Sequence, residues 1–495
     1  MRGIYTPVTK IRRQVFTEVA KFAFSKAPFS EIEKIPYRII PGEIAKYRDS
    51  VFKERAIVGE RIRLAIGLDL REHNGHAPLD EGIEESAISE TYYNHPLINI
   101  IKFACEACPE NSYYVTDNCR GCLAHPCAFV CPVNAVYIEK GKSHIDLKKC
   151  IRCGKCAAVC PYNAIVHYER PCAKACGVDA IGSDEYGRAD IDYDKCVACG
   201  MCLVNCPFSA ISDKSQIFQL IISMMAGDKI IAEVAPAFVG QFGENIPPEK
   251  VTSLLKEFGF SEVYEVAVGA DISAVHEAEL YMTEVPDKKP FLATSCCPSW
   301  ASMAKKLFPE IAHCISEGLT PMVTTARMLK KKYPDAKIVF IGPCSAKKLE
   351  AMRKSVRSDV DFVITFEEML GMFAAKGIVS DFGCKDEPFC DATAAGRGYA
   401  KTGGVSEAII NIIKEKEPDK IIKTECADNL SDCRKMLALA RAGKRDGYIL
   451  EGMACPGGCI GGAGTTLPNK KAMSLVEKYK ETSDKKLATE CDVKF

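Results

Sequence analysis

The stretch AKIVFIGPC (336–344) is a short apolar run that ends abruptly in Gly–Pro–Cys. A run of this length, rich in branched residues, predicts a buried β-strand. KIIAEVAP (229–236) has the same form, and helical stretches such as IPPEKVTSLLKEFGF (246–260) and GGVSEAIINIIKEK (403–416) alternate with these runs. This alternation predicts that residues 216–495 form an α/β domain, with two lobes of parallel sheet flanked by helices.

Composition and charge narrow the class of protein. The 495 residues are 47% hydrophobic and 26% charged, which is ordinary for a globular chain of about three domains. The formal net charge is zero, which argues against nucleic acid or an anionic membrane surface as the main partner. No apolar run approaches the roughly 20 residues that span a bilayer. Residues 1–26 lack the apolar core and cleavage site of an export signal, so we expect a cytoplasmic protein.

Residues 1–100 contain no cysteine and are expected to form a helical N-terminal segment. Ile11, Val15, Val19 and Phe22 recur at helical spacing, with Lys and Arg on the opposite face. A helix on a membrane surface is one interpretation of this pattern, and packing onto the protein's own core is the preferred one. The segment suggests no chemistry.

Cysteine is distributed very unevenly along the chain. There are 27 cysteines, with none before Cys105, sixteen from Cys105 to Cys206, and eleven beyond. A long chain without a secretory signal is not expected to form disulfides, so metal ligation is the prediction.

Residues 101–215 repeat one small module. HIDLKKCIRCGKCAAVCPYNAI (144–165) returns as DIDYDKCVACGMCLVNCPFSAI (190–211), and HPCAFVCPVNAV (125–136) returns as RPCAKACGVDAI (170–181). Each copy contains C-x2-C-x2-C-x3-C followed by proline. This spacing places three thiolates on one 4Fe–4S cube, while the fourth cysteine serves a second cube. The region resembles the bacterial ferredoxins, which implies an α+β iron–sulfur region.

Pairing of the half-modules divides the sixteen cysteines into four cubes. In the first module one cube takes Cys119, Cys122, Cys127 and Cys160, and the other takes Cys150, Cys153, Cys156 and Cys131. The second module contains Cys172, Cys176, Cys196, Cys199, Cys202 and Cys206 but lacks a leading C-x2-C, which Cys105 and Cys108 can supply. For Cys105 and Cys108 two alternatives remain: a separate zinc site, or two thiols that bind no metal. Three cubes therefore follow from the spacing, and a fourth is expected.

Three cysteine-bearing segments lie far apart in the α/β part: TSCCPSW (294–300), GPCSAKKLE (342–350) and EGMACPGGCIGGAGT (451–465). The C-x3-C spacing of the last is compatible with one helical turn, which would bring Cys455 and Cys459 to the same face. Together with Cys344 and one of the adjacent Cys296 and Cys297, they supply four thiolates, enough for another cube.

In this combination and order, the three segments resemble the signature of the FeFe-hydrogenases over about residues 216–495, and the ferredoxin-like front end fits that family. The resemblance implies reversible conversion of dihydrogen into two protons and two electrons at an H-cluster. In that cofactor a 4Fe–4S cube is joined through a cysteine sulfur to a two-iron centre carrying carbonyl, cyanide and azadithiolate ligands. Carried over by position, Cys297, Cys344, Cys455 and Cys459 would hold the cube, with Cys459 bridging to the two-iron centre.

The resemblance also implies roles for five other side chains. Lys347 would donate a hydrogen bond to a cyanide, and Met453 would pack beside the bridging region as an apolar cover. Cys296 would point away from the cube, toward the open coordination site, where a thiol can take and return a proton. From there the proton route would run to Glu277 and past Ser316.

Some positions depart from the family's pattern. Gly342 stands where a methionine usually precedes the Pro–Cys of the second segment, and Met322 stands where a glutamine is common. Leu280 occupies the place of an expected second relay glutamate, with Glu279 nearby but off that face. These differences leave the outer proton route open and indicate a less-studied branch of the family.

The remaining cysteines match no common cluster loop and are interpreted as reduced thiols: Cys314, Cys384, Cys390, Cys426, Cys433 and Cys491. The expected partners are a ferredoxin-type electron carrier and the hydrogenase maturation proteins. The alternative function is a non-catalytic, hydrogenase-like iron–sulfur assembly or dihydrogen-sensing protein, in which the adjacent thiol or the lysine would be lost. An electron-transfer subunit of a flavin or nicotinamide enzyme is a third hypothesis, but no G-x-G-x-x-G follows a predicted strand.

Overall fold

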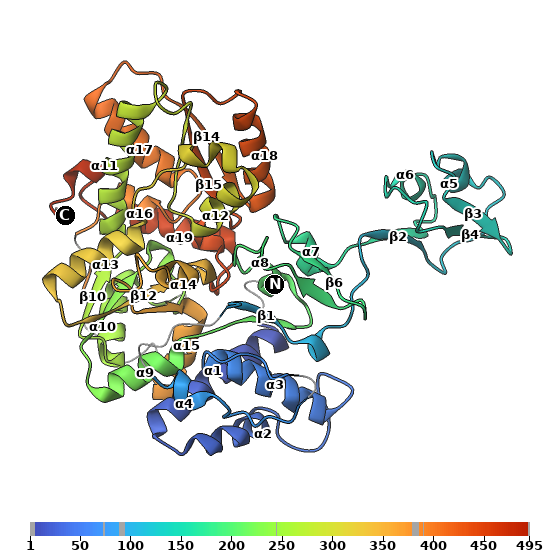
Figure 1. The fold of residues 1–495 in the computed structure, drawn as a ribbon, viewed down its shortest axis with the longest axis horizontal. Coiled ribbons are helices and arrows are strands. Elements are labelled where there is room, and N and C mark those ends of the chain that lie inside the picture. Colours follow the sequence, from blue (N-terminus) through green and yellow to red (C-terminus); the bar gives the residue numbers. More distant parts are fainter. Residues whose placement is uncertain are drawn as a thin grey trace.

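Two parallel sheets form the centre of the α/β part of the chain (Figure 1). The structure is a computed structural model, and it describes residues 5–72, 75–88, 95–243, 245–378, 386–389 and 391–493. The first sheet has the order β10-β9-β12-β13 and the second has the order β11-β15-β14. Their strands are β9 (Ile230–Val234), β10 (Glu262–Glu265), β12 (Lys337–Gly342), β13 (Phe362–Thr365), β11 (Leu292–Ala293), β14 (Lys423–Asp428) and β15 (Tyr448–Met453).

Helices cover both sheets, as the alternating pattern predicts. The α-helices of this part are α9 (Ile217–Ala226), α10 (Pro248–Phe258), α11 (Ala267–Glu284), α12 (Pro298–Leu307), α13 (Pro321–Lys332), α14 (Ser345–Ala351), α15 (Phe366–Lys376), α16 (Ala394–Gly398), α17 (Gly404–Lys416), α18 (Leu430–Arg441) and α19 (Asn469–Glu481). Short 3-10 turns are η3 (Pro236–Phe238), η4 (Pro309–Cys314), η5 (Cys459–Gly461) and η6 (Ala488–Glu490). The expected strands in 336–344 and 229–236 are β12 and β9, and the expected helices are α10 and α17. The predicted fold class is confirmed.

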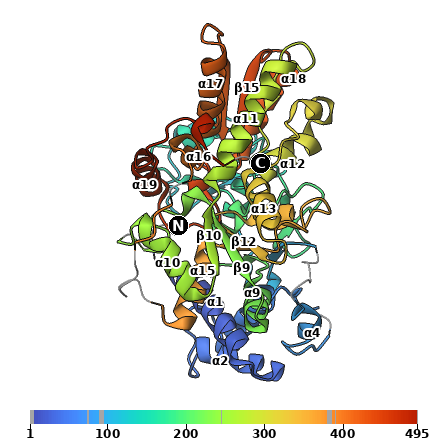
Figure 2. The ribbon, with the colours of Figure 1, turned by 90° about the vertical axis from the view of Figure 1, so that its left-hand side faces the viewer.

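The long helix α11 joins the two sheets. It follows β10 at the edge of the first sheet and leads to β11 of the second, packing on α13 and α17. In both views the first sheet lies between the N-terminal helices below and the β14–β15 sheet above (Figures 1 and 2). The lobes therefore stack along one axis, with α11 beside the place where they meet.

The iron–sulfur region consists of two copies of one fold. In one copy β2 (Ser112–Val115) pairs with β5 (Ile165–Tyr168), and in the other β1 (Ile98–Ile100) pairs with β8 (Ile211–Asp213). Each copy also has a short hairpin, β3 (Val136–Glu139) with β4 (Lys142–Ile145), and β6 (Ile181–Ser183) with β7 (Ala189–Ile191). The short helices are α5 (Pro126–Phe129), α6 (Lys155–Ala158), α7 (Pro171–Lys174) and α8 (Met201–Asn205), and η2 is Lys102–Ala104.

The first module is inserted into the second. Strand β1 and the pair Cys105 and Cys108 precede β2, whereas their partners in the second module follow β5. This insertion explains why the second module has no C-x2-C directly before Cys172. The inserted module, β2 to β5 with α5 and α6, projects from the body of the molecule as an arm (Figure 1).

The N-terminal helices pack against the first sheet and the second iron–sulfur module. They are α1 (Pro7–Ser25), η1 (Phe29–Lys34), α2 (Ile35–Ile39), α3 (Val51–Ala65) and α4 (Ile83–Ser86). Helix α1 buries Val15, Val19 and Phe22 against α9 and α15, as the apolar spacing predicts. Arg12 forms an ion pair with Glu367 at 2.6 Å.

Within the described ranges, no helix is long and apolar enough to cross a membrane. The domain limits 1–100, 101–215 and 216–495 stay a prediction.

Candidate functional site

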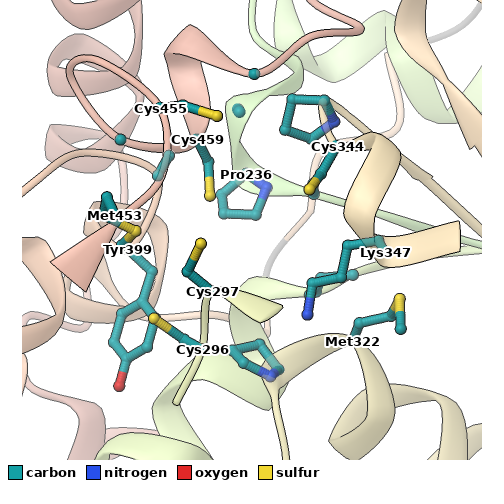
Figure 3. A pocket seen from close by; sticks show the side chains of 18 of the residues that line it. Pro236, Cys296, Cys297, Met322, Cys344, Lys347, Tyr399, Met453, Cys455 and Cys459 are labelled. Carbon is teal, nitrogen blue, oxygen red and sulfur yellow. The ribbon is translucent and has the colours of Figure 1, made fainter. Parts of the chain in front are cut away.

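A buried cavity lies where the two parallel sheets meet, at the carboxyl ends of their strands. Loops after β9, β12, β11 and β15 line it, together with residues of α11 and α13. Ligand sites form at this edge of parallel sheets because the strand-to-helix loops converge there. The thiols that line the cavity are Cys296, Cys297, Cys344, Cys455 and Cys459 (Figure 3). The chain thus brings the three cysteine segments to one place, as their combination predicts.

Two of these cysteines sit at helix N-termini. Cys297 is the N-cap residue of α12, and Cys344 is the N-cap residue of α14. The free backbone N–H groups of Ser299 and Trp300 face the Cys297 sulfur, and those of Ala346 and Lys347 face the Cys344 sulfur. Free N–H groups and the positive end of a helix favour an anionic sulfur.

Trp300, the single tryptophan, anchors the first of these helices. It is fully buried, and its indole N–H donates to the Thr294 carbonyl at 2.9 Å. A Cβ at Gly452 of β15 would overlap the Trp300 ring, so the absence of a side chain there lets the helix approach the strand. The packing fixes the position of Cys297 relative to the end of β15.

Cys455 and Cys459 are joined by a turn, so the expected helical turn between them is wrong. Gly457 and Gly458 have φ values of 81° and 93°, a conformation that only glycine adopts without strain. A Cβ on Gly458 would also lie 2.7 Å from the backbone nitrogen of Thr402. The two glycines reverse the chain, so that both thiols still line the same cavity.

The glycine-rich loop after β15 packs directly on the loop after β12. The Gly464 N–H donates to the Pro343 carbonyl at 2.8 Å, and a Cβ on Gly462 would overlap that same carbonyl. This close approach brings Cys455 and Cys459 next to Cys344, although more than a hundred residues separate them.

The lining fits a soft iron–sulfur group better than a single hard ion. Apart from the thiols and Lys347, the described residues that line the cavity are apolar or glycine, with the tyrosine Tyr399 at one side. Burial raises the pKa of Cys344 to about 11 and that of Cys459 to about 12. Such thiols are neutral near pH 7 unless a metal takes the place of the proton. Thiolate ligands select iron–sulfur clusters and other soft metals.

No three His, Cys, Asp or Glu side chains in the described part of the chain converge tightly enough to hold one metal ion. A 4Fe–4S cube differs from a single ion because each cysteine binds a different iron. The thiols around the cavity are therefore compatible with a cube.

Cys296 and Cys297 diverge, as their adjacency predicts. Cys297 packs against the apolar core around α12 and α18 and also against the core that contains Met453 and Tyr399, whereas Cys296 is packed against the second of these cores. Figure 3 shows the Cys297 sulfur directed toward Cys459 and the Cys296 sulfur directed toward Tyr399. Burial raises the pKa of Cys296 well above its ordinary value, and the nearby Glu451 carboxylate adds to this. Met453 is buried at the cavity wall, where the sequence expectation placed it.

Lys347 is the one charged side chain among the described residues that line the cavity. Its ammonium donates to the Glu350 carboxylate at 2.6 Å, and both groups are buried. Burial alone would lower the pKa of Lys347, but the Glu350 carboxylate and the neighbouring thiols raise it. The lysine is therefore held in its charged form, with further N–H donors available to the cavity.

Sequence reasoning missed three residues near Lys347 and Cys296. Glu350 follows Lys347 by three positions on a helix, a spacing at which side chains meet. Glu233 on β9 is fully buried, and neither carboxylate oxygen has a hydrogen-bond partner among the described residues. A glutamate inside the apolar run KIIAEVAP was a visible signal. Burial raises the pKa of Glu233 well above its ordinary value, while the Lys347 charge opposes the shift.

Tyr399 is the third missed residue, and no pattern in the sequence marks it. Its ring lines the cavity beside Cys296, and its buried hydroxyl has no hydrogen-bond partner among the described residues (Figure 3). Burial raises the pKa of Tyr399 well above its ordinary value, and charge on Cys296 or Glu277 would raise it further. The phenol therefore lies near both the Cys296 thiol and the buried Glu277.

Glu277 and Ser316 lie together behind Cys296. Both are buried, and the Ser316 hydroxyl hydrogen-bonds to the Glu277 carboxyl group. Burial raises the pKa of Glu277 to about 7, and the hydrogen bond from Ser316 opposes this shift. A carboxyl group with such a pKa can bind and release a proton near neutral pH.

The residues that depart from the family pattern each have a defined environment in the structure. A side chain on Gly342 would overlap the Phe340 ring, which itself lines the cavity. Met322 is buried in the cavity wall. Leu280 packs in the apolar core, and Glu279 forms an exposed ion pair with Lys416 at 3.2 Å. Neither of these last two residues continues the line from Glu277.

The cysteines of the second module gather in two sets of four, whereas the small core of the arm contains members of both sets expected there. A buried pocket is lined by Cys105, Cys108, Cys172 and Cys206. Cys196, Cys199 and Cys202 lie close enough to Cys176 that charge on Cys176 raises the pKa of each of the three. In the arm, Cys127, Cys131, Cys156 and Cys160 share one small core. The first pocket brings Cys105 and Cys108 together with Cys172 and Cys206, and cluster binding by Cys105 and Cys108 stays a prediction.

The C-x2-C loops share one backbone conformation. The residue before the second cysteine is left-handed in all four loops: Ala107, Gly121, Arg152 and Ala198. Backbone N–H groups donate to the sulfurs of Cys131, Cys160, Cys176 and Cys206 at 3.2–3.4 Å. In each case the donor is the residue four positions after the cysteine. The pair Cys105 and Cys108 thus has the same loop geometry as the other C-x2-C pairs, and N–H···S contacts of this kind tune cluster potentials.

The second module touches the cavity wall. Charge on Cys297 raises the pKa of Cys199, which places the two sulfurs near one another. The Ser299 hydroxyl, at the start of α12, donates to the Val197 carbonyl at 2.9 Å. The module next to the cavity is therefore the one that carries Cys176 and Cys196–Cys202.

The other described cysteines are free thiols: Cys314, Cys426, Cys433 and Cys491. Cys314 and Cys433 are buried in the apolar core around α12 and α18. Cys384 and Cys390 lie outside the described residues.

Comparison with known proteins agrees with this site. The family model described as "Iron only hydrogenase large subunit, C-terminal domain" matches residues 228–463, and models of a 4Fe–4S dicluster domain match residues 111–162 and 149–210. Iron hydrogenase 1 of Clostridium pasteurianum is 29% identical over 393 residues, which cover 68% of this chain and 67% of the relative.

Other relatives differ in name and extent. The NADP-reducing hydrogenase subunit HndD of Solidesulfovibrio fructosivorans is 29% identical over 64% of this chain and 55% of the relative, so the chain spans about half the length of that protein. The cytosolic Fe-S cluster assembly factor narfl of Danio rerio is 26% identical over 48% of this chain and 71% of the relative. A solved structure of the FeFe-hydrogenase HydA1 from Chlamydomonas reinhardtii matches with a TM-score of 0.41 and 21% identity, covering 54% of this chain and 88% of that one.

Fold and cysteine sites define an iron–sulfur protein in which ferredoxin-like 4Fe–4S domains precede an α/β domain. The chain is an FeFe-hydrogenase-like protein, and its hydrogenase relatives support an oxidoreductase.

Iron content tests the fourth ferredoxin-like cube. Protein made without the maturation machinery should contain about twenty irons, from five cubes of four. Cys105→Ala should lower this value to about sixteen, because Cys105 lines the pocket with three other thiols. Cys491→Ala is the matched control and should leave the iron content unchanged. An unchanged iron content in Cys105→Ala would exclude this cysteine as a ligand.

The buried pair of Lys347 and Glu350 predicts a pattern of stability. Lys347→Met should destabilise the α/β domain by about 3–5 kcal/mol, because it leaves a buried carboxylate unpaired. Adding Glu350→Gln should recover part of this loss, since the unpaired charge is then removed. Unfolding can be followed by the fluorescence of Trp300, which is buried in this domain. Lys435→Met, at a pair that is 76% exposed on the lysine side, should shift stability by less than about 1 kcal/mol.

Proposed function

We propose that the protein is an FeFe-hydrogenase, which interconverts dihydrogen with two protons and two electrons. The observation that carries the proposal is the fifth thiol: Cys296 lies beside the four-thiol cavity but is directed away from the other sulfurs, toward Tyr399 (Figure 3). A protein that only stores or transfers a cube needs four thiols, whereas cleavage of dihydrogen also needs a proton acceptor at the site.

The cavity residues would have different roles in binding an H-cluster. Cys297, Cys344, Cys455 and Cys459 would hold the 4Fe–4S cube of an H-cluster, and Cys459 would be shared with a two-iron centre. When bound, that centre supplies the redox chemistry that splits or forms dihydrogen. Lys347, held charged by Glu350, would donate a hydrogen bond to a cyanide ligand. Met453 and the apolar wall would exclude water from the same space.

Protons and electrons would leave by different routes. Cys296 would accept the proton and pass it toward Tyr399 and Glu277, which hydrogen-bonds with Ser316. Cys176, Cys196, Cys199 and Cys202 would hold a redox-active cube for electron transfer, and this set lies next to Cys297. Cys105, Cys108, Cys172 and Cys206 would hold a second cube of the same module.

The arm suggests where an electron carrier docks. It projects from the body of the molecule and would hold the two outermost cubes, so a partner can approach them closely (Figure 1). We propose a ferredoxin-type carrier as partner, hydrogenase maturation proteins for insertion of the two-iron centre, and a cytoplasmic location. The zero net charge gives no support to a nucleic-acid partner.

A non-catalytic role in iron–sulfur assembly or dihydrogen sensing is the second candidate, because some relatives are named as cytosolic Fe-S cluster assembly factors. Such a protein needs neither a proton acceptor at the cavity nor a charged lysine there. The presence of Cys296 and Lys347 in the cavity wall favours catalysis.

Dihydrogen oxidation by the matured protein tests the proposed function. The purified chain, loaded with the two-iron centre, should reduce a ferredoxin or a viologen dye with dihydrogen and should show carbonyl and cyanide infrared bands. It should not reduce NAD, because the described residues offer no recognisable nucleotide-binding loop. Carbonyl and cyanide bands without dye reduction would favour the sensing role, and reduction of NAD by the lone chain would contradict the proposed electron partner.

Substitutions of Cys296 and Cys297 test proton transfer and cube binding separately. Cys297→Ala should lose iron and the carbonyl and cyanide bands, because it removes a cube ligand. Cys296→Ala should keep the iron and the bands but lower turnover by roughly 10²–10⁴-fold, the effect of losing a positioned proton donor. Cys296→Asp restores a protonatable group and should recover part of the activity. Loss of iron in Cys296→Ala, or normal turnover, would show that the roles are assigned wrongly.

A further inference from the structure

The buried acid Glu277 lies beneath the protein surface, next to an exposed residue of its own helix. Glu277 is 5% exposed and Ser316 is 2% exposed, so neither can exchange a proton with bulk water directly. Along α11 the next turn offers Leu280, which packs in the apolar core. Glu279 is engaged with Lys416 on the surface. The continuation from Glu277 must therefore come from another neighbour.

His276 is that neighbour. It precedes Glu277 on α11 and is exposed to solvent. A Cβ placed on Gly318, in the loop after β11 and η4, would lie 3.0 Å from His276 Cδ2, 3.1 Å from Ser316 Oγ and 3.2 Å from Glu277 Oε1. Three side chains from two segments thus surround the same small space, which is open because residue 318 has no side chain.

Hydrogen bonds connect Gly318, Ser316 and Glu277 beside this space. Gly318 N–H donates to Ser316 Oγ at 3.0 Å, which leaves the hydroxyl hydrogen free to point at the Glu277 carboxyl group. The imidazole ring and the buried pair are direct neighbours, because His276 Cδ2, Ser316 Oγ and Glu277 Oε1 each lie 3.0–3.2 Å from the same point. Histidine is the side chain that exchanges protons with water most readily near neutral pH.

We propose that His276 is the outer proton-relay residue of this protein, which takes the proton from Glu277 and Ser316 and releases it to solvent over Gly318. The inference rests on the proposed function for its biological meaning. Glu277 gives up its carboxyl proton through the Ser316 hydroxyl, and the imidazole accepts it. The imidazolium then releases the proton to bulk water, so each group returns to its starting state while electrons leave separately through the cubes.

Hydrogen–deuterium exchange at Glu277 tests the proposal without any hydrogenase activity. The full chain made without the two-iron centre is rapidly mixed with D2O at about pH 6, where a carboxyl group with a pKa of about 7 is protonated. Its carboxylic C=O infrared band shifts on deuteration, and Glu277→Gln identifies that band by its loss. His276→Gln should slow the exchange by about tenfold or more, since a positioned proton acceptor is removed.

Three further variants sharpen the result. His144→Gln changes an exposed histidine in the arm and should leave the exchange rate unchanged. His276→Glu should exchange faster than His276→Gln, because it again provides a protonatable group, and added imidazole should accelerate exchange in His276→Gln. Gly318→Ala should slow exchange with His276 in place, because the new methyl group fills the shared space.

The proposal is overturned if His276→Gln exchanges as fast as the wild-type chain, or if neither His276→Glu nor imidazole restores the rate. Its failure is distinct from failure of the proposed function. A chain that exchanges through His276 but shows no dihydrogen oxidation after maturation would contradict the hydrogenase proposal alone. If the matured protein oxidises dihydrogen but His276→Gln changes neither turnover nor the exchange rate of Glu277, only the relay proposal is contradicted.

Discussion

The contact between the loop after β15 and the loop after β12 is the constraint on which the site depends. Gly464 donates to the Pro343 carbonyl, and Gly462 lies so close to it that no side chain could be accommodated. This contact joins the carboxyl ends of two separate sheets, and it sets the positions of Cys344, Cys455 and Cys459 relative to one another. A larger residue at either glycine would separate the lobes and move three thiols at once.

Burial controls the chemistry of the side chains around the cavity. Glu233, Glu277 and Glu451 all lie inside the protein, and burial raises the pKa of each. Only Lys347 supplies a positive charge to the described cavity wall, and Glu350 accompanies it. A cavity wall with one cation, surrounded by several protonatable acids, can hold a polarised group and still move protons, because neutral carboxyl groups are cheap to bury and can be charged briefly.

The N-terminal helices have a structural role that composition did not reveal. Arg48 donates to the backbone carbonyls of Ala104 and Phe208, and Arg61 donates to the Ser209 hydroxyl. These contacts fix the chain directly beside Cys105 and Cys206. The helices also pack on the first sheet through α9 and α15. They therefore hold the second iron–sulfur module against the α/β domain, which keeps its cysteines at the cavity wall.

Local spacing decided what the sequence alone could predict. The C-x2-C loops, the duplicated module, the buried strands and the divergence of Cys296 and Cys297 depend on residues close along the chain, whose geometry is set by short-range sterics and periodicity. The sequence also predicted that Cys105 and Cys108 join Cys172, because the second module lacks a C-x2-C pair of its own. Only the tertiary structure placed Tyr399 beside Cys296, paired Lys347 with Glu350 inside the cavity wall, and brought His276 to Ser316 over Gly318. It also replaced the expected helical turn between Cys455 and Cys459, because contact with Thr402 requires two left-handed glycines there. These features join segments far apart in sequence, and their positions depend on packing between lobes, which leaves no periodic signal.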